Sequence, residues 1–239
     1  MKNNKKKYNI LAITLARGNS KGIKKKNIIN LGNKPLIYYT IKEAKKSKFI
    51  SEYIVSTDDL EIKEIAESYN VQVPFLRPKK YARDKSSSVE ALQHAVKFME
   101  KIKAHKYDFV VELMVTNPLK NYTDIDECIK KIILTKADSV IAVHQLEDHH
   151  PARIKKIVDD KIKDFCVKEK KESRRQDLKP KAYIRSGSIY ALKRDYLMNK
   201  SERYGSNNSR PYVLPKKRAV NIDEASDLVL AEHMLKLKK

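Results

Sequence analysis

The chain alternates short apolar segments with longer amphipathic stretches. Apolar runs rich in β-branched and aliphatic side chains are typical of buried strands, which are predicted over 9–16, 53–56, 71–76, 110–114, 139–144 and 189–192, with weaker candidates at 213 and 219–222. Amphipathic periodicity predicts helices over 35–48, 60–69, 86–105, 123–135 and 224–237. Because strands and helices alternate, the pattern predicts an α/β fold with a mainly parallel sheet covered on both faces.

The alternation stops between residues 153 and 185. Segments 154–158 and 162–167 predict a short hairpin around Asp159 and Asp160. The very polar segment 168–181 is either a mobile loop or an arm that a partner orders. We therefore expect a basic tail over 1–8 and one domain over 9–239, with 153–185 as a small extension.

Charge favours a solvated basic surface over a nucleic-acid-binding groove. The chain has 52 Lys and Arg residues against 30 Asp and Glu, a formal net charge of +22. Such an excess can indicate nucleic-acid binding. However, the lysines are spread along the whole chain, without aromatic stacking clusters or a helix-turn-helix pattern. Nucleic-acid binding thus stays an alternative, and we expect no nucleic-acid partner.

Cysteine usage and hydropathy suggest an intracellular setting. Cys128 and Cys166 lie far apart and form no CxxC pair, so a structural zinc site is not expected and both thiols are expected to stay reduced. The first apolar run is too short for a signal-peptide core or a membrane span. We therefore expect a cytoplasmic protein with no membrane partner.

The loop after the first strand carries the clearest candidate chemistry. Residues 15–27 read LARGNSKGIKKKN and hold two glycines with five cationic side chains, Arg17, Lys21, Lys24, Lys25 and Lys26. Glycines let backbone N–H groups approach a phosphate, and cations neutralise its charge. The loop therefore suits a polyphosphate, whereas a plain solvated basic turn is the alternative.

Several motifs in order resemble the acylneuraminate cytidylyltransferases, the CMP-sialic acid synthetase family with its legionaminate branch. These motifs are LARGNSKGIKKKN, YIVSTDD, FLRPKKYARDKSSS, TNPLK, HHP and NIDEASD, and the similarity spans about 10–232. The resemblance implies a Rossmann-like nucleotidyltransferase fold with an inserted dimerisation extension. It also implies a homodimer, with CTP and Mg2+ (or Mn2+) as cosubstrate and cofactor and a sugar acid as acceptor.

The resemblance assigns the nucleotide site by position. It gives nucleotide contacts to Leu15, Ala16, Arg17, Asn19, Ser20, Lys21, Asn27, Arg77, Ser87 and Ser88. Arg17 and Lys21 are expected to act on the phosphates, because arginine grips two oxygens in a planar fork and lysine supplies a point charge. Ser87 and Ser88 also fit a helix cap, and both roles can hold together.

The resemblance assigns the acceptor site with two departures. Met114 stands where the family usually has Gln, and Ser186 stands where it has Asn. The full set expected near the sugar is Met114, Thr116, Asn117, His149, His150, Arg153, Arg175, Ser186 and Tyr190. A metal site at His149 and His150 is disfavoured, because adjacent residues on a strand point to opposite faces. A structural role for one of these histidines is an equal alternative.

The segment Asn221-Ile222-Asp223 resembles a metal-binding Asp-Ile-Asp segment. On a strand, Asn221 and Asp223 would share a face, where their oxygens would suit Mg2+. The alternative is that Asp223 only caps the closing helix. The expected catalytic residues are Arg17, Lys21 and Asp223, and Asp227 is expected behind them.

The resulting hypothesis is a Mg2+-dependent cytidylyltransferase. The anomeric hydroxyl of a nonulosonic acid would attack the α-phosphorus of CTP, and pyrophosphate would leave. Alternatives are a cytidylyltransferase for another sugar acid such as 3-deoxy-manno-octulosonate, an inactive nucleotide-binding relative and a nucleic-acid-binding protein.

Overall fold

A six-stranded sheet forms the centre of the molecule. The structure, a computed structural model, describes residues 8–20, 22–147, 149–169 and 174–237. In the order β10-β6-β9-β5-β1-β4, only β9 runs antiparallel to its neighbours. The predicted α/β fold with a mainly parallel sheet is confirmed. The strands of this sheet are β1 (Ile10–Leu15), β4 (Glu52–Ser56), β5 (Phe109–Leu113), β6 (Ser139–Gln145), β9 (Tyr183–Lys193) and β10 (Ser209–Val213).

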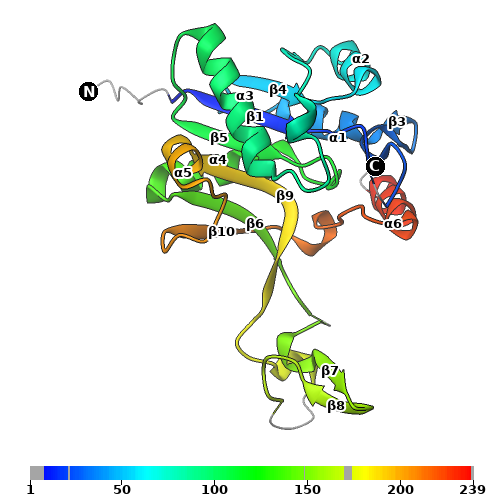
Figure 1. Cartoon of the computed structure of the whole chain (residues 1–239). Coiled ribbons are helices and arrows are strands. Elements are labelled where there is room, and N and C mark those ends of the chain that lie inside the picture. Colours follow the sequence, from blue (N-terminus) through cyan, green and yellow to red (C-terminus); the bar gives the residue numbers. More distant parts are fainter. Residues whose placement is uncertain (1–7, 21, 148, 170–173, 238–239) are drawn as a thin grey trace.

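Helices cover both faces of the sheet (Figure 1). On one face, α4 (Tyr122–Thr135) packs Ile125 and Ile129 against alternate residues of β1, β5 and β9. On the other, α3 (Ser88–Lys103) and α5 (Arg194–Lys200) pack Leu92 and Leu197 against the intervening residues. A third core cluster joins α1 (Leu36–Ala44), α2 (Leu60–Ser68) and α6 (Ala225–Lys236). The predicted three-layer arrangement follows from these apolar contacts.

Side-chain caps fix where the two longest helices begin. Ser87 accepts the N–H of Glu90 at α3, and Asn121 accepts the N–H of Asp124 at α4. In both cases the third helical residue returns a carboxylate to the cap's own N–H, which completes a capping box. Thr123 and Asp124, from which the second helix was expected to start, lie inside it.

Two predicted strands differ from the structure, and one observed helix was not predicted. Segment 71–76 forms only two isolated bridges, Ile54 with Gln72 and Thr57 with Leu76, since Pro74 has no N–H to donate within a ladder. Segment 219–222 is not a strand, and 216–218 forms a 3-10 turn. The seven-residue α5 was not predicted, because so short a helix shows little periodicity.

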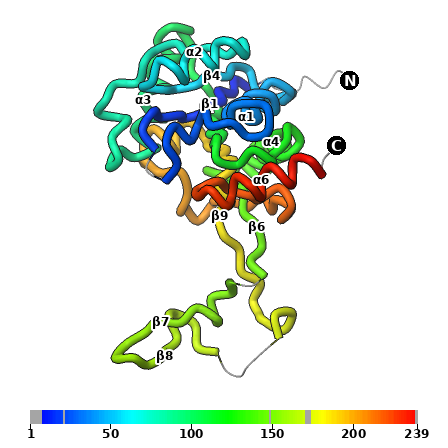
Figure 2. Tube along the Cα trace, turned by 90° about the vertical axis from the view of Figure 1, so that its right-hand side faces the viewer, coloured from blue at the N-terminus to red at the C-terminus, as the bar shows by residue number. Residues whose placement is uncertain are grey.

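An arm extends from the sheet (Figures 1 and 2). Beyond the sheet β6 and β9 stay paired as far as Gln145 with Tyr183, and they lead to the hairpin β7 (Lys155–Val158) and β8 (Lys161–Asp164). The predicted hairpin is confirmed. Its turn residues Asp159 and Asp160 have φ of 51° and 57°, as a two-residue type I′ turn requires.

The second small pair, β2 (Asn30–Leu31) with β3 (Lys34–Pro35), leads into α1. Across the described ranges, no helix combines the length and the apolar character that crossing a membrane requires.

Candidate functional site

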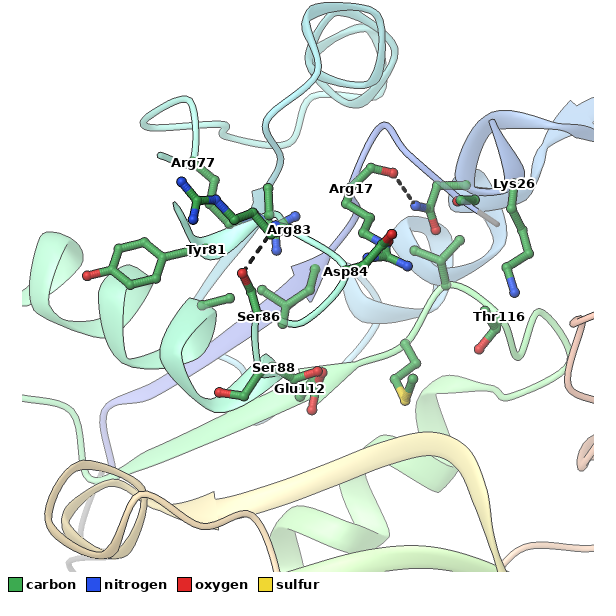
Figure 3. A pocket seen from close by; sticks show the side chains of 18 of the residues that line it. Arg17, Lys26, Arg77, Tyr81, Arg83, Asp84, Ser86, Ser88, Glu112 and Thr116 are labelled. Carbon is green, nitrogen blue, oxygen red and sulfur yellow. Dashed lines mark hydrogen bonds and ion pairs between the residues drawn. The ribbon is translucent and has the colours of Figure 1, made fainter. Parts of the chain in front are cut away.

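A cleft of about 730 Å3 opens at the carboxyl ends of β1 and β5 (Figure 3). Ligands of open α/β sheets bind at this edge, because the loops that follow the parallel strands gather there. The loop after β1 supplies Arg17 and Lys26, the segment before α3 supplies Arg77 and Arg83, and the segment before α6 supplies Asp223. The remaining lining residues are Leu15, Ser20, Gly22, Asn27, Tyr81, Ala82, Asp84, Ser86, Ser87, Ser88, Ala91, Glu112, Met114, Val115, Thr116 and Asn221.

Hydrogen bonds to its backbone groups hold the loop after β1 in place. The Asn27 side-chain amide donates to the carbonyl of Arg17 at 2.8 Å, and the N–H of Gly18 donates to Asp58 at 3.1 Å. A side chain at Gly22 would place its Cβ 2.7 Å from the carbonyl oxygen of Asp223. Glycine is therefore required there, because the loop and the segment before α6 approach too closely for a Cβ.

Two cations of this loop reach the cleft and rest on carboxylates. Arg17 Nη1 lies 3.1 Å from Asp84 Oδ1, and Lys26 Nζ lies 2.9 Å from Asp223 Oδ1 and 3.0 Å from the carbonyl of Ile222. Lys25 instead pairs with Glu61 outside the cleft. The loop thus aims part of its positive charge inward. Lys21, expected to act on phosphate, lies outside the described residues.

Arg77 is a buried cation in the cleft wall. Its side chain donates to the carbonyl of Ser56 at 3.1 Å and lies 3.9 Å from Asp58. Burial lowers the pKa of its guanidinium and the charge of Arg17 adds to this, while Asp58 acts in the opposite direction. Within the described part of the chain, its Nε–H is buried without a hydrogen-bond acceptor. A buried unpaired donor is costly, so this site suits an acceptor on a ligand.

Asn221 and Asp223 meet without a strand to align them. Asn221 Nδ2 donates to Asp223 Oδ2 at 2.5 Å, and the Asp227 carboxylate accepts the backbone N–H groups of Asp223 and Glu224, each at 2.8 Å. The cap of α6 is Glu224. The strand geometry expected for this segment is therefore wrong, and so is the alternative in which Asp223 caps the helix, yet the two side chains still come together.

In the part of the chain that the structure describes, two buried oxygens of cleft-lining side chains lack hydrogen-bond donors. Among the described residues, Asn221 Oδ1 and Thr116 Oγ1 are buried with no hydrogen-bond partner, and both residues line the cleft. The N–H of Ile222 donates to the carbonyl of Thr116 at 2.8 Å, which joins the two segments. Gly187 lies with φ of 57° where a Cβ would stand 3.1 Å from Asn221 Oδ1. The cleft therefore presents oxygens that a cation could satisfy.

The remaining predicted nucleotide residues lie in or next to the cleft. The cleft lining includes Leu15, Ser20, Ser87 and Ser88. Ser87 is also the N-cap of α3, so it lines the cleft and caps the helix at the same time. Ala16 and Asn19 belong to the same loop but are not in the lining. The roles of these side chains toward a nucleotide stay predictions.

Five of the predicted acceptor residues lie in the main body of the molecule, either in the cleft lining or buried near it. Met114 and Thr116 line the cleft. Asn117 is fully buried, where its amide donates to the carbonyls of Arg218 and Val220 at 3.0 and 2.9 Å. Ser186 is buried and donates to the carbonyl of Ala142 at 2.9 Å, while Tyr190 is 4 % exposed. For Asn117 and Ser186 the structure thus shows internal contacts, and a sugar contact stays a prediction.

Four predicted acceptor residues lie on the arm, away from this cleft (Figures 1 and 2). These are His149, His150, Arg153 and Arg175. His150 Nε2 lies 2.9 Å from the carbonyl of Pro180, while Nδ1 accepts the N–H of Ala152 at 3.2 Å. This pattern holds the base of the arm together and leaves neither nitrogen of His150 to a metal.

Sequence reasoning assigned no role to Asp84, Arg83 or Glu112, and it named Lys26 only among the cations of the loop after β1. Lys26 and Asp84 carry the ion pairs described above, and Arg83 also lines the cleft (Figure 3). Glu112 is 2 % exposed on the cleft floor and contacts Arg203 at 2.6 Å. A signal for it did exist, because Glu112 is the one charged residue within the apolar strand β5.

Comparison with known proteins identifies the family. The cytidylyltransferase family model matches residues 11–224. A pseudaminic acid cytidylyltransferase of Campylobacter jejuni is 32% identical over 95% of this chain and 96% of its own length. A CMP-N,N'-diacetyllegionaminic acid synthase from the same species is 28% identical over 96% of both chains.

A solved structure supports the fold independently of sequence. A CMP:2-keto-3-deoxy-manno-octonic acid synthetase complexed with CTP superposes with a TM-score of 0.71 over 97% of this chain and 100% of its own, at 16% identity. At that identity the likeness shows the fold alone. The family model matches most of the chain, and the structural likeness agrees with it in fold. This chain therefore belongs to the cytidylyltransferase family and is a nucleotidyltransferase of α/β fold.

Proposed function

We propose that the protein transfers CMP from CTP to the anomeric hydroxyl of a nonulosonic acid of the sialic, legionaminic or pseudaminic type, with release of pyrophosphate. One observation carries the proposal: Arg17 and Lys26, from the loop after β1, share one cleft with Asn221 and Asp223, from the far end of the chain. Phosphoryl transfer depends on positioning and on neutralising charge, and this arrangement supplies both. The related pseudaminic and legionaminic acid enzymes support the choice of acceptor class.

In this proposal, two cations exchange their protein carboxylates for phosphate. Arg17 leaves Asp84 and Lys26 leaves Asp223 when a triphosphate enters, because a phosphate carries more charge than one carboxylate and offers several oxygens. Both cations then lie on the leaving pyrophosphate. The unpaired Nε–H of Arg77 takes an acceptor on the nucleotide.

The residues present fit Mg2+. Asp223 and Asn221 would hold the ion, and the buried Thr116 hydroxyl belongs to a residue that lines the same cleft. Within the described ranges, no three His, Cys, Asp or Glu side chains cluster as a metal site. Mg2+ uses few protein ligands and completes its octahedron with water and substrate phosphates, so Asp223 and Asn221 would be enough. Bound there, Mg2+ (or Mn2+) would supply charge that polarises the α-phosphate.

The acceptor site is completed, in our proposal, by a second copy of the chain. The arm exposes apolar side chains that a folded monomer leaves uncovered, with Ile157 and Ile162 each 78 % exposed and Phe165 61 % exposed. A homodimer would cover them and would bring His149, Arg153 and Arg175 to a partner's cleft. We place this dimer in the cytoplasm, where its nucleotide substrate is made.

Pyrophosphate release with a panel of sugar acids tests the function. The purified protein is incubated with CTP, Mg2+ and one acid at a time, namely N-acetylneuraminic, legionaminic, pseudaminic or 3-deoxy-manno-octulosonic acid, and the products are identified by mass spectrometry. We expect a CMP-nonulosonate product. If only 3-deoxy-manno-octulosonic acid gives a product, that sugar acid and not a nonulosonic acid is the substrate. If CTP binds but no pyrophosphate is released with any acid, the protein is an inactive relative.

A further inference from the structure

Glu112 differs from the other acidic residues of the cleft. Asp84 and Asp223 rest on cations that are aimed at phosphate. Glu112 is 2 % exposed, yet it lines the cleft, and its partner Arg203 comes from the segment after α5. The cytidylyl-transfer steps proposed above use neither Glu112 nor Arg203. A buried charge is expensive unless it is paired and hydrogen-bonded, and the pair with Arg203 uses only one oxygen of Glu112.

Arg203 is held in one position by aromatic rings and the Glu112 carboxylate. Its Nη1 lies 2.6 Å from Glu112 Oε2, and its guanidinium lies over the ring of Tyr190 at 4.7 Å from the centroid. Arg185 lies in the same way over Tyr204 at 4.4 Å, and the two tyrosine rings are 6.4 Å apart. Through Arg203 this stack holds one oxygen of the Glu112 carboxylate, while Glu112 itself lines the cleft.

One carboxylate oxygen stays available. Among the described residues, Glu112 accepts a single hydrogen bond, through Oε2, and Oε1 accepts none. Burial raises the pKa of this carboxyl group, and the charge and hydrogen bond of Arg203 act against that rise. An ionised carboxylate can accept several hydrogen bonds, so a cleft ligand with an N–H or O–H group would meet an unfilled acceptor.

The position of Glu112 selects the acceptor sugar as that ligand. Glu112 pairs across the sheet with Tyr190, and alternation along β5 places it on the same face as Met114. Both neighbours stand at positions predicted for the acceptor. Figure 3 shows Glu112 on the cleft floor, away from Arg77 and from Lys26, which serve the nucleotide in our proposal.

We propose that Glu112 is a specificity-determining residue, whose Oε1 accepts a hydrogen bond from a donor, an amide N–H or a hydroxyl, on the acceptor sugar acid. Arg203 is a positioning residue that aims this carboxylate. The inference rests on the proposed function and deepens it. A substituent without a donor at that position would leave the buried carboxylate unpaired and would be rejected.

Pairs of sugar acids that differ in one hydrogen-bond donor test this assignment. The best sugar acid of the panel is compared with analogues that each lose one donor, by N-methylation of an amide or deoxygenation of a hydroxyl. For the wild-type protein we expect kcat/KM to fall about 10- to 100-fold for one of these analogues, the usual range for a hydrogen bond to a charged group. The same ratio is measured as acceptor affinity by calorimetry with a non-hydrolysable CTP analogue bound.

Two variants separate recognition from folding. Glu112→Leu with Arg203→Leu removes both charges together, which avoids a lone buried charge, and should bring the ratio close to one while CTP affinity stays unchanged. Glu112→Gln keeps an acceptor oxygen and should give an intermediate ratio, and it serves alone if the double variant does not fold. The matched control is Glu100→Leu with Arg194→Leu, an ion pair at 2.8 Å outside the cleft, which should leave the wild-type ratio.

Three results would overturn the inference. These are a wild-type ratio near one for every analogue, an unchanged ratio in both Glu112 variants, or a loss of CTP affinity equal to the loss with the parent acid. The last would make Glu112 a nucleotide residue. If the wild-type protein converts no sugar acid and binds none, the proposed function itself fails, which the panel reveals before any variant is made.

Discussion

The cleft and the arm differ in which side chains have partners within the chain. In the cleft, charged side chains are paired with one another, as Arg17 is with Asp84 and Lys26 with Asp223. On the arm, apolar side chains lie uncovered, with Ile157 and Ile162 both 78 % exposed. The first region is preorganised for a highly charged ligand that displaces internal partners, whereas the second lacks a partner for its apolar face. The cleft of a single chain should therefore bind CTP by itself, and changes on the arm should affect turnover with the acceptor sugar acid.

The largest expected effect comes from Asp223→Ala. Loss of this carboxylate removes the principal metal ligand of our proposal, and pyrophosphate release should fall on the order of 10^3-fold. Weaker binding of Mn2+ in the presence of CTP, followed by electron paramagnetic resonance, should accompany it. The exposed Asp195→Ala on α5 is the control. Near-normal turnover would remove Asp223 from the chemistry.

Next is Arg218→Met, which tests how much a buried ion pair outside the cleft contributes to stability. Arg218 binds the fully buried Asp124 through two bonds of 2.9 and 2.6 Å, and Tyr212 donates to the same carboxylate at 2.8 Å. Removing one partner of a buried pair costs about 3–5 kcal/mol. Urea unfolding should show a loss of this size, whereas the exposed Arg210→Met should stay within about 0.5 kcal/mol of wild type.

A smaller effect, confined to the acceptor, is expected from Ile157→Thr with Ile162→Thr. These residues face each other across the hairpin, and threonine keeps their strand preference while it removes apolar area. Analytical ultracentrifugation should show more monomer, and turnover with the sugar acid should fall about 10-fold with CTP affinity unchanged. Lys156→Gln with Lys163→Gln, the neighbouring pair of the same hairpin, is the control. An unchanged sedimentation coefficient would remove the dimer from the proposal.

The smallest effect is expected from Asp84→Asn. The Arg17–Asp84 pair is half-exposed, and such pairs contribute about 0.2–1 kcal/mol. If Asp84 competes with phosphate for Arg17, CTP should bind up to about 5-fold more tightly, as measured by calorimetry at low salt. Weaker binding would instead mean that Asp84 helps to orient Arg17 for the triphosphate.

The elements that pack by periodic apolar faces could be predicted from sequence. The strand leading to Leu15 and the helix capped by Ser87 were predicted within two residues of their observed ends, because burial and capping are local signals. The meeting of Asn221 with Arg17 in one cleft depended on family motifs, since 200 or so residues separate the two segments. Periodicity carries no such distance information.

Lys120 shows what sequence reasoning could not supply. It is the last residue of the TNPLK motif, yet the side chain is 1 % exposed and its ammonium donates to Thr40 Oγ1 and to the carbonyls of Met114 and Asn117. Burial of a lysine depends on acceptors from three separate positions, which no local pattern reveals. The contact between Glu112 and Arg203 was missed for the same reason.

Strand β9 joins the arm to the central sheet, because it runs from Tyr183 to Lys193. Its pairing with β6 shifts register between Ile141 and Val143, where Gly187 has φ of 57°, so the strand bulges between the arm and Tyr190. Such an irregularity can absorb an inserted residue, whereas the regular pairing of Glu112 with Tyr190 cannot. Natural changes in arm length should therefore lie at or beyond this bulge, a rule that homologous sequences will either obey or break.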